Sequence, residues 1–360
     1  MTDAASAAGA RVRDSRAVAV AARYRWPLFA LLVALSVWND AHAVPLDVLV
    51  FQRAGRHLLS GAWRTTFADP SLQAGPVFLA VYGALRSQLA VSLVVQPLTV
   101  AGLVLTVRRA RRALGLGPDA RAELIAGVVL LALQVPSGAY LDGHPAQVLL
   151  PLLWVHAALD AREGRPVRAG LLLALGANVE TWALLGVPVL LWLPAWRQRV
   201  ASVAVAAVAA VAPLLPFLLL GTVRTQEYVW RVEPGVPVAP LVGPTFPWWL
   251  RLAQALAAAG AGALAWRLLR RLPEAVWAVP LAVVVVRLLL DPILYGYYWL
   301  AANALATVAA GVATRRAWPA LLGAYAVLLE PLVGVWAAVC LCLAGLALTA
   351  LPRVSGRPSP

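Results

Sequence analysis

The sequence predicts an all-α, polytopic integral membrane protein with about 10–12 transmembrane or half-membrane helices. Hydrophobic residues make up 62% of the chain and its mean hydropathy is +0.78, whereas soluble domains contain roughly 45–50% apolar residues. About ten apolar stretches approach or exceed the roughly 20 residues that cross a bilayer. The basic residues gather in short clusters beside these stretches, as they do in cytoplasmic loops.

Arginine alone carries the positive charge of the chain. The net charge is +14 and the pI is about 11.1, and the sequence contains no lysine. A nucleic-acid-binding protein would carry such charge on a soluble basic patch, and no soluble domain is available here. We therefore expect membrane lipids, and no nucleic acid, among the partners of this protein.

The N-terminal part of the sequence predicts a basic tail, a first span and a long outer loop. Residues 1–25 contain five arginines and are expected to stay in the cytoplasm. Residues 26–44 predict the first span. Together with the basic segment before it, this span resembles a secretory signal, but that segment is long for a signal, so we favour an uncleaved span. Residues 44–76 then form the first outer loop. The apolar segment 76–85 is too short to cross the bilayer.

The next segments alternate between the two sides of the membrane. Residues 89–107 predict a full span that ends at an arginine cluster, residues 108–112, in the cytoplasm. The third span, residues 123–135, leads to an outer turn at residues 137–145, which is rich in Gly, Pro and Asp. The fourth span returns to a basic cytoplasmic turn at residues 160–168.

Two half-length apolar segments follow, residues 169–177 and 182–192, separated by a polar break. Basic residues flank the pair on both sides, which indicates that the chain enters the membrane and comes back. Residues 200–220 predict another span, and residues 221–247 form the second outer loop. Five prolines exclude a continuous helix in this loop, and its aromatic residues are more typical of an interfacial belt than of a sugar platform.

The C-terminal part of the sequence predicts two further hairpins. One turns at residues 291–292 and returns to arginines at residues 315–316, and the other turns near residues 330–331. The membrane domain then covers residues 26–351, and residues 352–360 form a second cytoplasmic tail. The predicted location is the cell membrane, with several passes and with both termini in the cytoplasm.

Most acidic residues outside the arginine clusters fall on the predicted outer side. Acids near a bilayer are costly and usually mark a site or a pathway, so we expect a pocket at this face. Asp47 is the centre of this candidate site, because it follows a long apolar run and a proline at the start of a short amphipathic segment. It is a candidate general base; alternatively, it caps a helix that begins at Val48. The further candidates are Asp69, His144, Glu227 and Asp291.

The residue types on the outer side favour group transfer from a lipid-phosphate donor. A carboxylate in low-dielectric surroundings has a raised pKa, which suits it to accept a proton from an attacking hydroxyl. Arginines hold a phosphate in forked contacts, and the candidates are Arg53, Arg56, Arg224 and Arg231. The sequence contains no Gly-rich phosphate loop, no His-Glu-x-x-His and no Cys-x-x-Cys, so we expect neither a cofactor nor a metal.

Several candidates also have simpler structural interpretations. Asp69 and Asp142 are as consistent with turn residues as with ligand contacts. On helices, His156 and Asp160 would pair at a spacing of four residues. Arg287 would form an intrahelical ion pair with Asp291, four residues later, although both side chains also have the reach to enter the outer pocket.

The N-terminal half of the sequence resembles a known family. The first loop and the segments after it are similar to the GT-C glycosyltransferases, most nearly family 87, the polyprenyl-phosphate-mannose-dependent bacterial enzymes. The similarity covers roughly residues 26–199. It is carried by Asp47, Ala54-Gly55, Leu58-Leu59-Ser60-Gly61, Gly75-Pro76, Gly143-His144-Pro145-Ala146, Arg162-Glu163-Gly164-Arg165 and Ala169-Gly170.

The resemblance implies an inverting, metal-independent transfer of a sugar, with mannose the expected one, from polyprenyl phosphate to a lipid or glycan acceptor at the outer face, with Asp47 as the base. The chain departs from the family pattern at three places. Asn178 and Glu180 stand where the family often has a lysine, His144 replaces a glutamine, and Ala146 replaces an asparagine. A divergent or inactive member would show such changes.

Two other classes of protein remain open. A transporter or lipid flippase would also contain half-helices around polar residues, such as the break at residues 178–181. Against this alternative, the polar residues gather on one side of the membrane rather than at its middle, and we see no inverted repeat. A structural membrane partner without chemistry is the third alternative.

Overall fold

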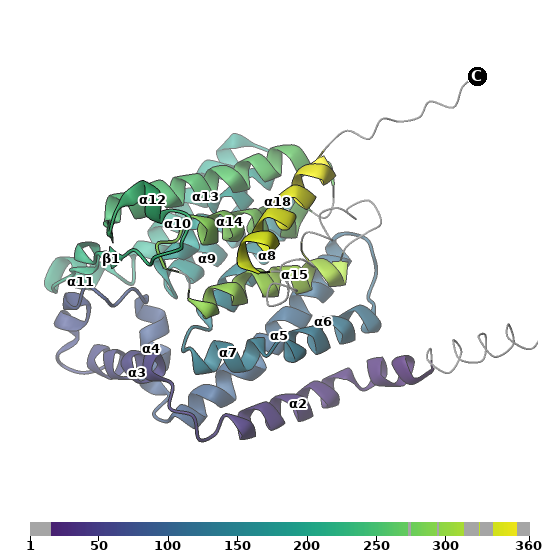
Figure 1. Cartoon of the computed structure of the whole chain (residues 1–360), viewed down its shortest axis with the longest axis horizontal. Helices are drawn as coiled ribbons and strands as arrows, with labels where there is room; N and C mark the ends of the chain where they lie inside the picture. Colours follow the sequence, from purple (N-terminus) through teal and green to yellow (C-terminus); the bar gives the residue numbers. More distant parts are fainter. Residues whose placement is uncertain (1–15, 273–274, 294, 313–323, 325–333, 351–360) are drawn as a thin grey trace, which may run out of the picture.

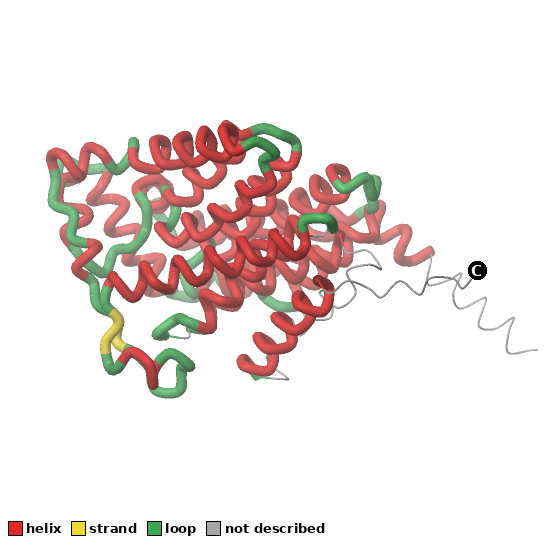
Figure 2. The backbone as a smooth tube through the Cα atoms, turned by 90° about the horizontal axis from the view of Figure 1, so that it is seen from above, coloured by secondary structure: helices red, strands yellow, loops and turns green. Residues whose placement is uncertain are grey.

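The computed structural model describes residues 16–272, 275–293, 295–312, 324 and 334–350. The described part is mostly helical, and its only strands are β1 (Trp230–Arg231) and β2 (Thr245–Phe246), which form one antiparallel pair. The all-α class predicted from the sequence is therefore confirmed. Figure 2 shows this small strand pair among loops at one end of the helical body.

The first half of the chain forms helices that differ widely in length. A helix at Arg16–Arg23 precedes α2. Proline opens α4 at its first position, where its missing N–H is not needed. The side chains of Ser87 and Asp119 accept hydrogen bonds from the first free amides of α5 and α6. The elements are α2 (Arg25–Asn39), α3 (Leu46–Leu58), η1 (Trp63–Ala68), α4 (Pro76–Ala84), α5 (Gln88–Ala113), α6 (Ala120–Ala132) and α7 (Val135–Leu141).

Helix α8 (Ala146–Arg162) lies at the centre of the molecule (Figure 1). It packs against α5 and α7 on one side and against the following helices on the others. Large side chains such as Leu150, Trp154 and Leu159 are fully buried along it. The remaining elements are α9 (Pro166–Ala177), η2 (Thr181–Trp192), α10 (Trp196–Val211), α11 (Leu215–Leu220), η3 (Thr225–Glu227), α12 (Ala239–Val242), α13 (Trp248–Leu269), α14 (Ala275–Leu289), η4 (Gly296–Tyr298), α15 (Trp299–Val312) and α18 (Val335–Ala350).

Among the described residues, two helices are long and apolar enough to cross a membrane, α5 and α13. The number rises to four if each bent pair counts as one span. These pairs are Arg16–Arg23 with α2, bent by 74°, and α6 with α7, bent by 44°. The helices indicate membrane association.

Two predicted segments are wrong in detail. Residues 137–141 belong to α7 and are not part of a turn, which is confined to Asp142–Pro145. The bend lies earlier, because Gln134 adopts a left-handed conformation (φ 53°) shortly before Pro136. The predicted span 200–220 is divided into α10 and α11, because prolines at positions 213 and 216 interrupt the helical hydrogen bonds.

Other predicted features agree with the structure. The short segment after the first loop is α4, with nine residues. The two half-length segments are α9 and η2, separated at residues 178–180. The second predicted outer loop is irregular, with short helical turns and the strand pair. The predicted returns at residues 315–316 and 330–331 and the tail 352–360 lie outside the described residues.

The predicted outer loops come together in space. The amides of Thr222 and Arg224 donate hydrogen bonds to the carbonyls of Arg64 and Phe67, at 2.8 and 2.9 Å. The amide of Gly75 donates to the carbonyl of Val179 at 2.8 Å. The two long loops and the break between α9 and η2 are therefore joined through their backbones, at the end of the molecule where α3 and α4 lie (Figure 1).

Arginines from the predicted cytoplasmic segments meet two buried acids. Arg25 and Arg108 both pair with Glu123 at 2.7 Å. Arg109 pairs with Asp160 at 2.6 Å, near the C-terminal end of α8. This end of α8 is about 20 Å along the helix from its first turn, which lies at the joined loops. The arginine clusters and the loops therefore occupy different ends of α8.

Candidate functional site

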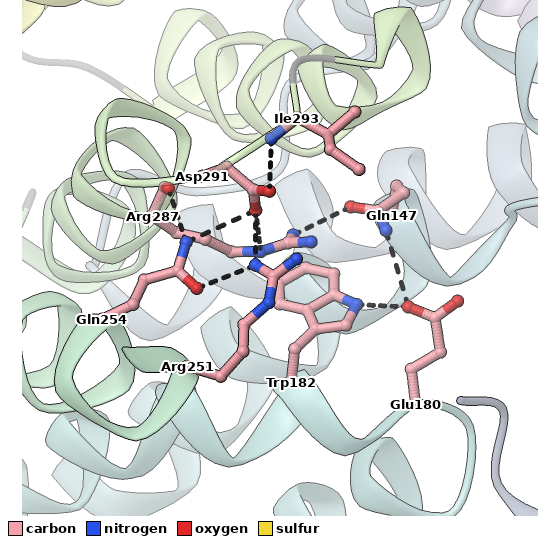
Figure 3. A network of polar contacts seen from close by, with 8 residues as sticks. All are labelled: Gln147, Glu180, Trp182, Arg251, Gln254, Arg287, Asp291 and Ile293. Carbon is pink, nitrogen blue, oxygen red and sulfur yellow. Dashed lines mark hydrogen bonds and ion pairs between the residues drawn. The ribbon is translucent and has the colours of Figure 1, made fainter. Parts of the chain in front are cut away.

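A continuous chain of polar contacts links six charged side chains at the joined loops. It starts at Asp47 on α3 and passes through His144 in the loop before α8. It then reaches Glu180 between α9 and η2, and from there α13 and α14. Figure 3 shows the part of this network that runs from Glu180 to Asp291. The members are Asp47, His144, Gln147, Glu180, Arg251, Gln254, Arg287 and Asp291.

His144 lies between two carboxylates. Its Nε2 is 2.9 Å from Asp47 Oδ2, and its Nδ1 is 3.4 Å from Glu180 Oε1. An ionised carboxylate only accepts hydrogen bonds, so both ring nitrogens must donate and the ring is an imidazolium. The ring stacks on Tyr297, with 4.0 Å between the ring centroids, and meets the edge of Phe51. These contacts fix the orientation of the ring.

A glycine permits the close approach of Asp47 and His144. Gly143 adopts φ +73°, a left-handed conformation that favours glycine. A Cβ atom at this position would lie 2.8 Å from the Cβ of Asp47 and 2.9 Å from the amide nitrogen of Val48. The turn before α8 can therefore lie directly against the first turn of α3 only because residue 143 has no side chain.

The two carboxylates change the titration of His144. Burial lowers the pKa of the imidazole, but its hydrogen bonds to Asp47 and Glu180 and the charges of these acids outweigh burial and raise the pKa to about 9. His144 is therefore charged at neutral pH. Asp142, in the same turn, has a raised pKa because it is partly buried.

Glu180 connects this pair of side chains to the centre of the molecule. Its Oε2 accepts hydrogen bonds from Gln147 Nε2, at 3.5 Å, and from the indole N–H of Trp182. The carbonyl oxygen of the Gln147 side chain accepts from Arg287 Nη1 at 3.1 Å. Gln147 thus bridges an acid and a base, as Figure 3 shows.

Asp291 forms the inner end of the network and is 1% exposed. Its Oδ2 lies 3.0 Å from Arg251 Nη1 and 3.8 Å from Arg287 Nε. Gln254 donates to the same carboxylate oxygen and to the carbonyl of Arg287. The predicted ion pair between Arg287 and Asp291 is therefore confirmed, and Asp291 holds a second arginine as well.

The two arginines also lie over aromatic rings. The guanidinium carbon of Arg287 is 4.1 Å from the ring centroid of Trp182 and 4.7 Å from that of Tyr298. The guanidinium carbon of Arg251 is 4.2 Å from the ring centroid of Trp230. Aromatic faces stabilise a desolvated guanidinium, so both side chains are held firmly in place.

The network is balanced in charge and open at one place. Three acids, Asp47, Glu180 and Asp291, face three cations, His144, Arg251 and Arg287. The side chain of Asp47 is 49% exposed, whereas those of His144 and Glu180 are 13% and 10% exposed. Of these three side chains, Asp47 is therefore the one that an external molecule can reach most easily.

Three of the nine predicted site residues belong to this network: Asp47, His144 and Asp291. Asp47 does not cap its helix, because α3 begins at Leu46, its N-cap is Pro45, and no side chain makes a capping hydrogen bond. The capping alternative, with a helix that begins at Val48, is therefore wrong. Asp47 lies one residue inside the helix, where a negative charge still interacts favourably with the helix dipole.

The predicted phosphate-binding arginines of the first loop lie elsewhere. Arg53 and Arg56 are exposed on α3, and no ion pair to either is found in the described part of the chain. They follow Asp47 by six and nine residues, which places them roughly 120° and 180° around the helix axis from it. They therefore cannot face the same ligand group as Asp47 at close range.

The remaining candidates are exposed in the loops. Arg224 and Glu227 pair with each other at 2.6 Å; their hydrogen bond raises the pKa of the arginine and lowers that of the acid. Arg231 is exposed on β1. Asp69 accepts hydrogen bonds from the amide and hydroxyl of Ser71, which confirms its interpretation as a turn residue.

Four residues of the network are not among the candidates from the sequence: Gln147, Glu180, Arg251 and Gln254. Arg287 is considered there only as the ion-pair partner of Asp291, with the reach to enter the outer pocket. The signal that could have found them is a charged or amide side chain within an apolar stretch, as for Arg251 and Arg287, because such residues need a buried partner. In the sequence, Glu180 stands out as a departure from the resembled family and as part of the polar break at residues 178–181. In another part of the molecule, His156 and Asp160 do not pair directly, because Arg109 lies between them.

No family model, curated protein or solved structure matches the chain. Within the described residues, no group of three or more His, Cys, Asp or Glu side chains is arranged to hold a metal ion. The site is therefore interpreted from its own residues.

We expect the stability of the protein to fall as the pH rises from about 6.5 to 9. The folded-state pKa of His144, about 9, lies above its ordinary value of 6.5. The charged His144 ring contributes its full stabilisation below pH 6.5, and this stabilisation is lost as the pH rises through the folded-state pKa. The change is on the order of 3 kcal/mol in the free energy of unfolding. Thermal unfolding of detergent-solubilised protein across this pH range measures the effect.

The control for this prediction is a second histidine. His57→Gln alters a partly exposed ring that contacts Thr65 outside the network, so this variant should keep the pH dependence of the wild type. His144→Gln should show a flatter dependence. The same slope in His144→Gln and in the wild type would contradict the assignment of the charged ring.

Proposed function

We propose that this chain is a polytopic membrane glycosyltransferase that moves a sugar from a polyprenyl-phosphate donor to a lipid or glycan acceptor. The observation that carries the proposal is the half-exposed Asp47 carboxylate at the open end of a buried, charge-balanced network. A group fixed in this way keeps its position during a reaction, which is what a general base requires. The similarity of the first loop to family 87 supports the same role.

The proposed reaction is a direct displacement. The hydroxyl oxygen of the acceptor attacks the anomeric carbon of the sugar on the face opposite to the phosphate. The bond between this carbon and the phosphate oxygen breaks, and its electron pair leaves with the phosphate. The hydroxyl proton passes to Asp47, and the configuration at the anomeric carbon is inverted.

His144 and Glu180 position the base in this proposal. The imidazolium donates to Asp47 Oδ2 and leaves Oδ1 free to accept the proton. Glu180 holds the other side of the ring. Arg224 and Arg231 are the proposed contacts of the donor phosphate, because both are exposed on a loop whose backbone is joined to the first loop, which begins next to Asp47.

The test is transfer by the purified chain. The protein in detergent is mixed with radiolabelled mannosyl polyprenyl phosphate and a membrane-lipid extract as the source of acceptors, and labelled product is separated from the donor. The expected result is product formation that depends on the protein and on Asp47. The proposal would be overturned if the wild-type protein formed no more product than an Asp47→Asn sample with any of several polyprenyl-phosphate sugars as donor.

The proposal places the network at the outer face of the membrane. In a background with Cys340→Ser and Cys342→Ala, single cysteines at the exposed positions 60 and 226 should react with an impermeant thiol reagent in intact cells. A cysteine at position 113, which is exposed after an arginine cluster, should react only after the membrane is opened. The opposite labelling pattern would reverse the orientation and remove the outer-face site.

A second candidate function is transport or lipid flipping. The observation in its favour is Glu180, an acid that is 8% exposed at the break between two half-length helices. A transporter would move a lipid phosphate across proteoliposomes without breaking a glycosidic bond. Such movement in an Asp47→Asn sample, together with no sugar transfer by the wild type, would favour this alternative.

A further inference from the structure

A basic, tryptophan-lined cleft lies at the arginine-rich end of the molecule. Its volume is about 310 Å³, at the lower end of the roughly 300–1,000 Å³ of small-molecule sites. The C-terminal end of η2, the first turn of α10 and the C-terminal end of α13 form its walls. The side chains that matter for its chemistry are Trp192, Arg199, Trp266, Arg270 and Arg271.

This cleft is separate from the candidate site described above. Arg251 belongs to the network and Trp266 to the cleft, and both lie on α13. Fifteen residues of α-helix separate them, which corresponds to about 22 Å along the axis. A ligand in the cleft therefore does not touch the network.

Two arginines of the cleft lie beside one of its tryptophan rings. The guanidinium carbons of Arg199 and Arg270 lie 5.6 and 5.5 Å from the ring centroid of Trp266. Arg199 Nε donates to the carbonyl of Leu193 at 2.9 Å, which fixes the base of its guanidinium group. The other nitrogens of this fork have no hydrogen bond to another described residue. The fork is therefore held in place with donors available to a ligand.

Two tryptophans that line the cleft contain an indole N–H that the protein covers. The indole Nε1 atoms of Trp192 and Trp266 are buried and make no hydrogen bond within the described residues. Because these two nitrogen atoms have essentially no accessible surface, they do not face the open cleft and do not donate to a ligand in it. Both belong to residues that line the cleft.

The charge of the cleft is not compensated by the part of the chain that the structure describes. No carboxylate of these residues forms an ion pair with Arg199, Arg270 or Arg271. Glu274, the nearest acid in the sequence, lies outside the described residues. Arg199 lies in the first turn of α10, where the helix dipole disfavours a cation and favours an anion. The dipole of α10 therefore does not stabilise the charge of Arg199 at this position, whereas a bound anion would.

We propose that this cleft binds a phosphate group, carried either by an anionic lipid head group or by a soluble phosphate ester. Arginine forks are donors without acceptor capacity, which matches the oxygens of a phosphate. Basic clefts between helices on one side of a membrane protein are typical places for such head groups. The site goes beyond the proposed transfer reaction and takes no part in it.

The experiment measures thermal unfolding of the full chain in neutral detergent at constant ionic strength. Phosphatidylglycerol, phosphatidylcholine and glycerol 3-phosphate are each titrated. A ligand that binds the folded state raises the unfolding temperature. The expected result is a saturable rise with phosphatidylglycerol and none with phosphatidylcholine, whose head group carries no net charge.

A matched pair of double variants tests the location of the site. Arg199→Gln/Arg270→Gln removes two arginines that line the cleft, and it should raise the half-saturating concentration at least about tenfold. Arg197→Gln/Arg267→Gln removes two exposed arginines from the same helices that do not line it. This control should bind like the wild type. Equal loss in both variants, or no loss in the first, would overturn the proposal.

Two more measurements complete the test. Trp266→Phe keeps both arginines but replaces the indole ring beside their guanidinium groups with a weaker cation–π partner. It should weaken binding several-fold while its size-exclusion profile stays that of the wild type. This variant decides the result if the double variant fails to fold, and wild-type affinity in it would then overturn the proposal. Glycerol 3-phosphate that binds and competes with the lipid identifies a soluble ligand, whereas binding of phosphatidylglycerol alone identifies a lipid head group.

Discussion

Asp47→Asn is expected to lower the rate of sugar transfer about 10²–10⁴-fold while the protein stays folded. The amide cannot accept the proton of the acceptor hydroxyl. The amide oxygen can still accept a hydrogen bond from His144 Nε2, which in the wild-type protein lies 2.9 Å from Asp47 Oδ2. Helix α3 loses no cap, because its N-cap is Pro45 and no side chain serves as one. Initial rates at saturating donor and thermal unfolding are the two measurements.

The control for this variant is Asp69→Asn. Asp69 is an exposed acid of the same loop, and within the described residues its carboxylate bonds only to Ser71 in its own turn, so its amide variant should keep the wild-type rate. A wild-type rate in Asp47→Asn would remove the base from the proposal. Glu180 would then be the first acid to test, because it belongs to the same network, and Glu227 would follow.

The sequence predicted the helical class and several of its irregular parts. The short α4, the break between α9 and η2 and the irregular second loop all follow from run length and proline content. The meeting of Asp47 and His144 was also within reach. Both lie at predicted outer ends of apolar segments, so sidedness alone brought them to one face of the protein.

The partners within the network could not be predicted in the same way. Arg287 and Gln147 are 140 residues apart in the sequence and meet at 3.1 Å. A single polar residue in an apolar stretch indicates that a buried partner exists, but it does not say which one. Choosing the partner requires the packing of α8 against α14, and neither periodicity nor charge fixes that packing.

The arginines of the first loop illustrate a different limit. Arg53 and Arg56 were selected because their charge suits a phosphate, without regard to the face of the helix. The sequence already placed them on one short amphipathic segment with Asp47, and a period of 3.6 residues separates them from it by roughly 120° and 180°. Helical periodicity could therefore have corrected this prediction before the structure.

The buried part of the network has a consequence for stability. Asp291 is the acid that faces Arg251 and Arg287, whose side chains are 12% and 8% exposed. Removal of one partner from a buried ion pair leaves an uncompensated charge, which costs more than the pair contributes to stability. The effect of a substitution should therefore depend on how many charges it leaves without a partner.

Asp291→Asn is expected to lower the free energy of unfolding by about 3–5 kcal/mol, because it leaves two buried arginines without an acid. Arg251→Met should cost less, since Asp291 then still pairs with Arg287. Glu227→Gln, which alters an exposed pair, should be nearly silent. Denaturant unfolding of the three variants in detergent measures the order. If Asp291→Asn is no less stable than Arg251→Met, the two arginines do not depend on this carboxylate, and the network does not hold the inner end of the site.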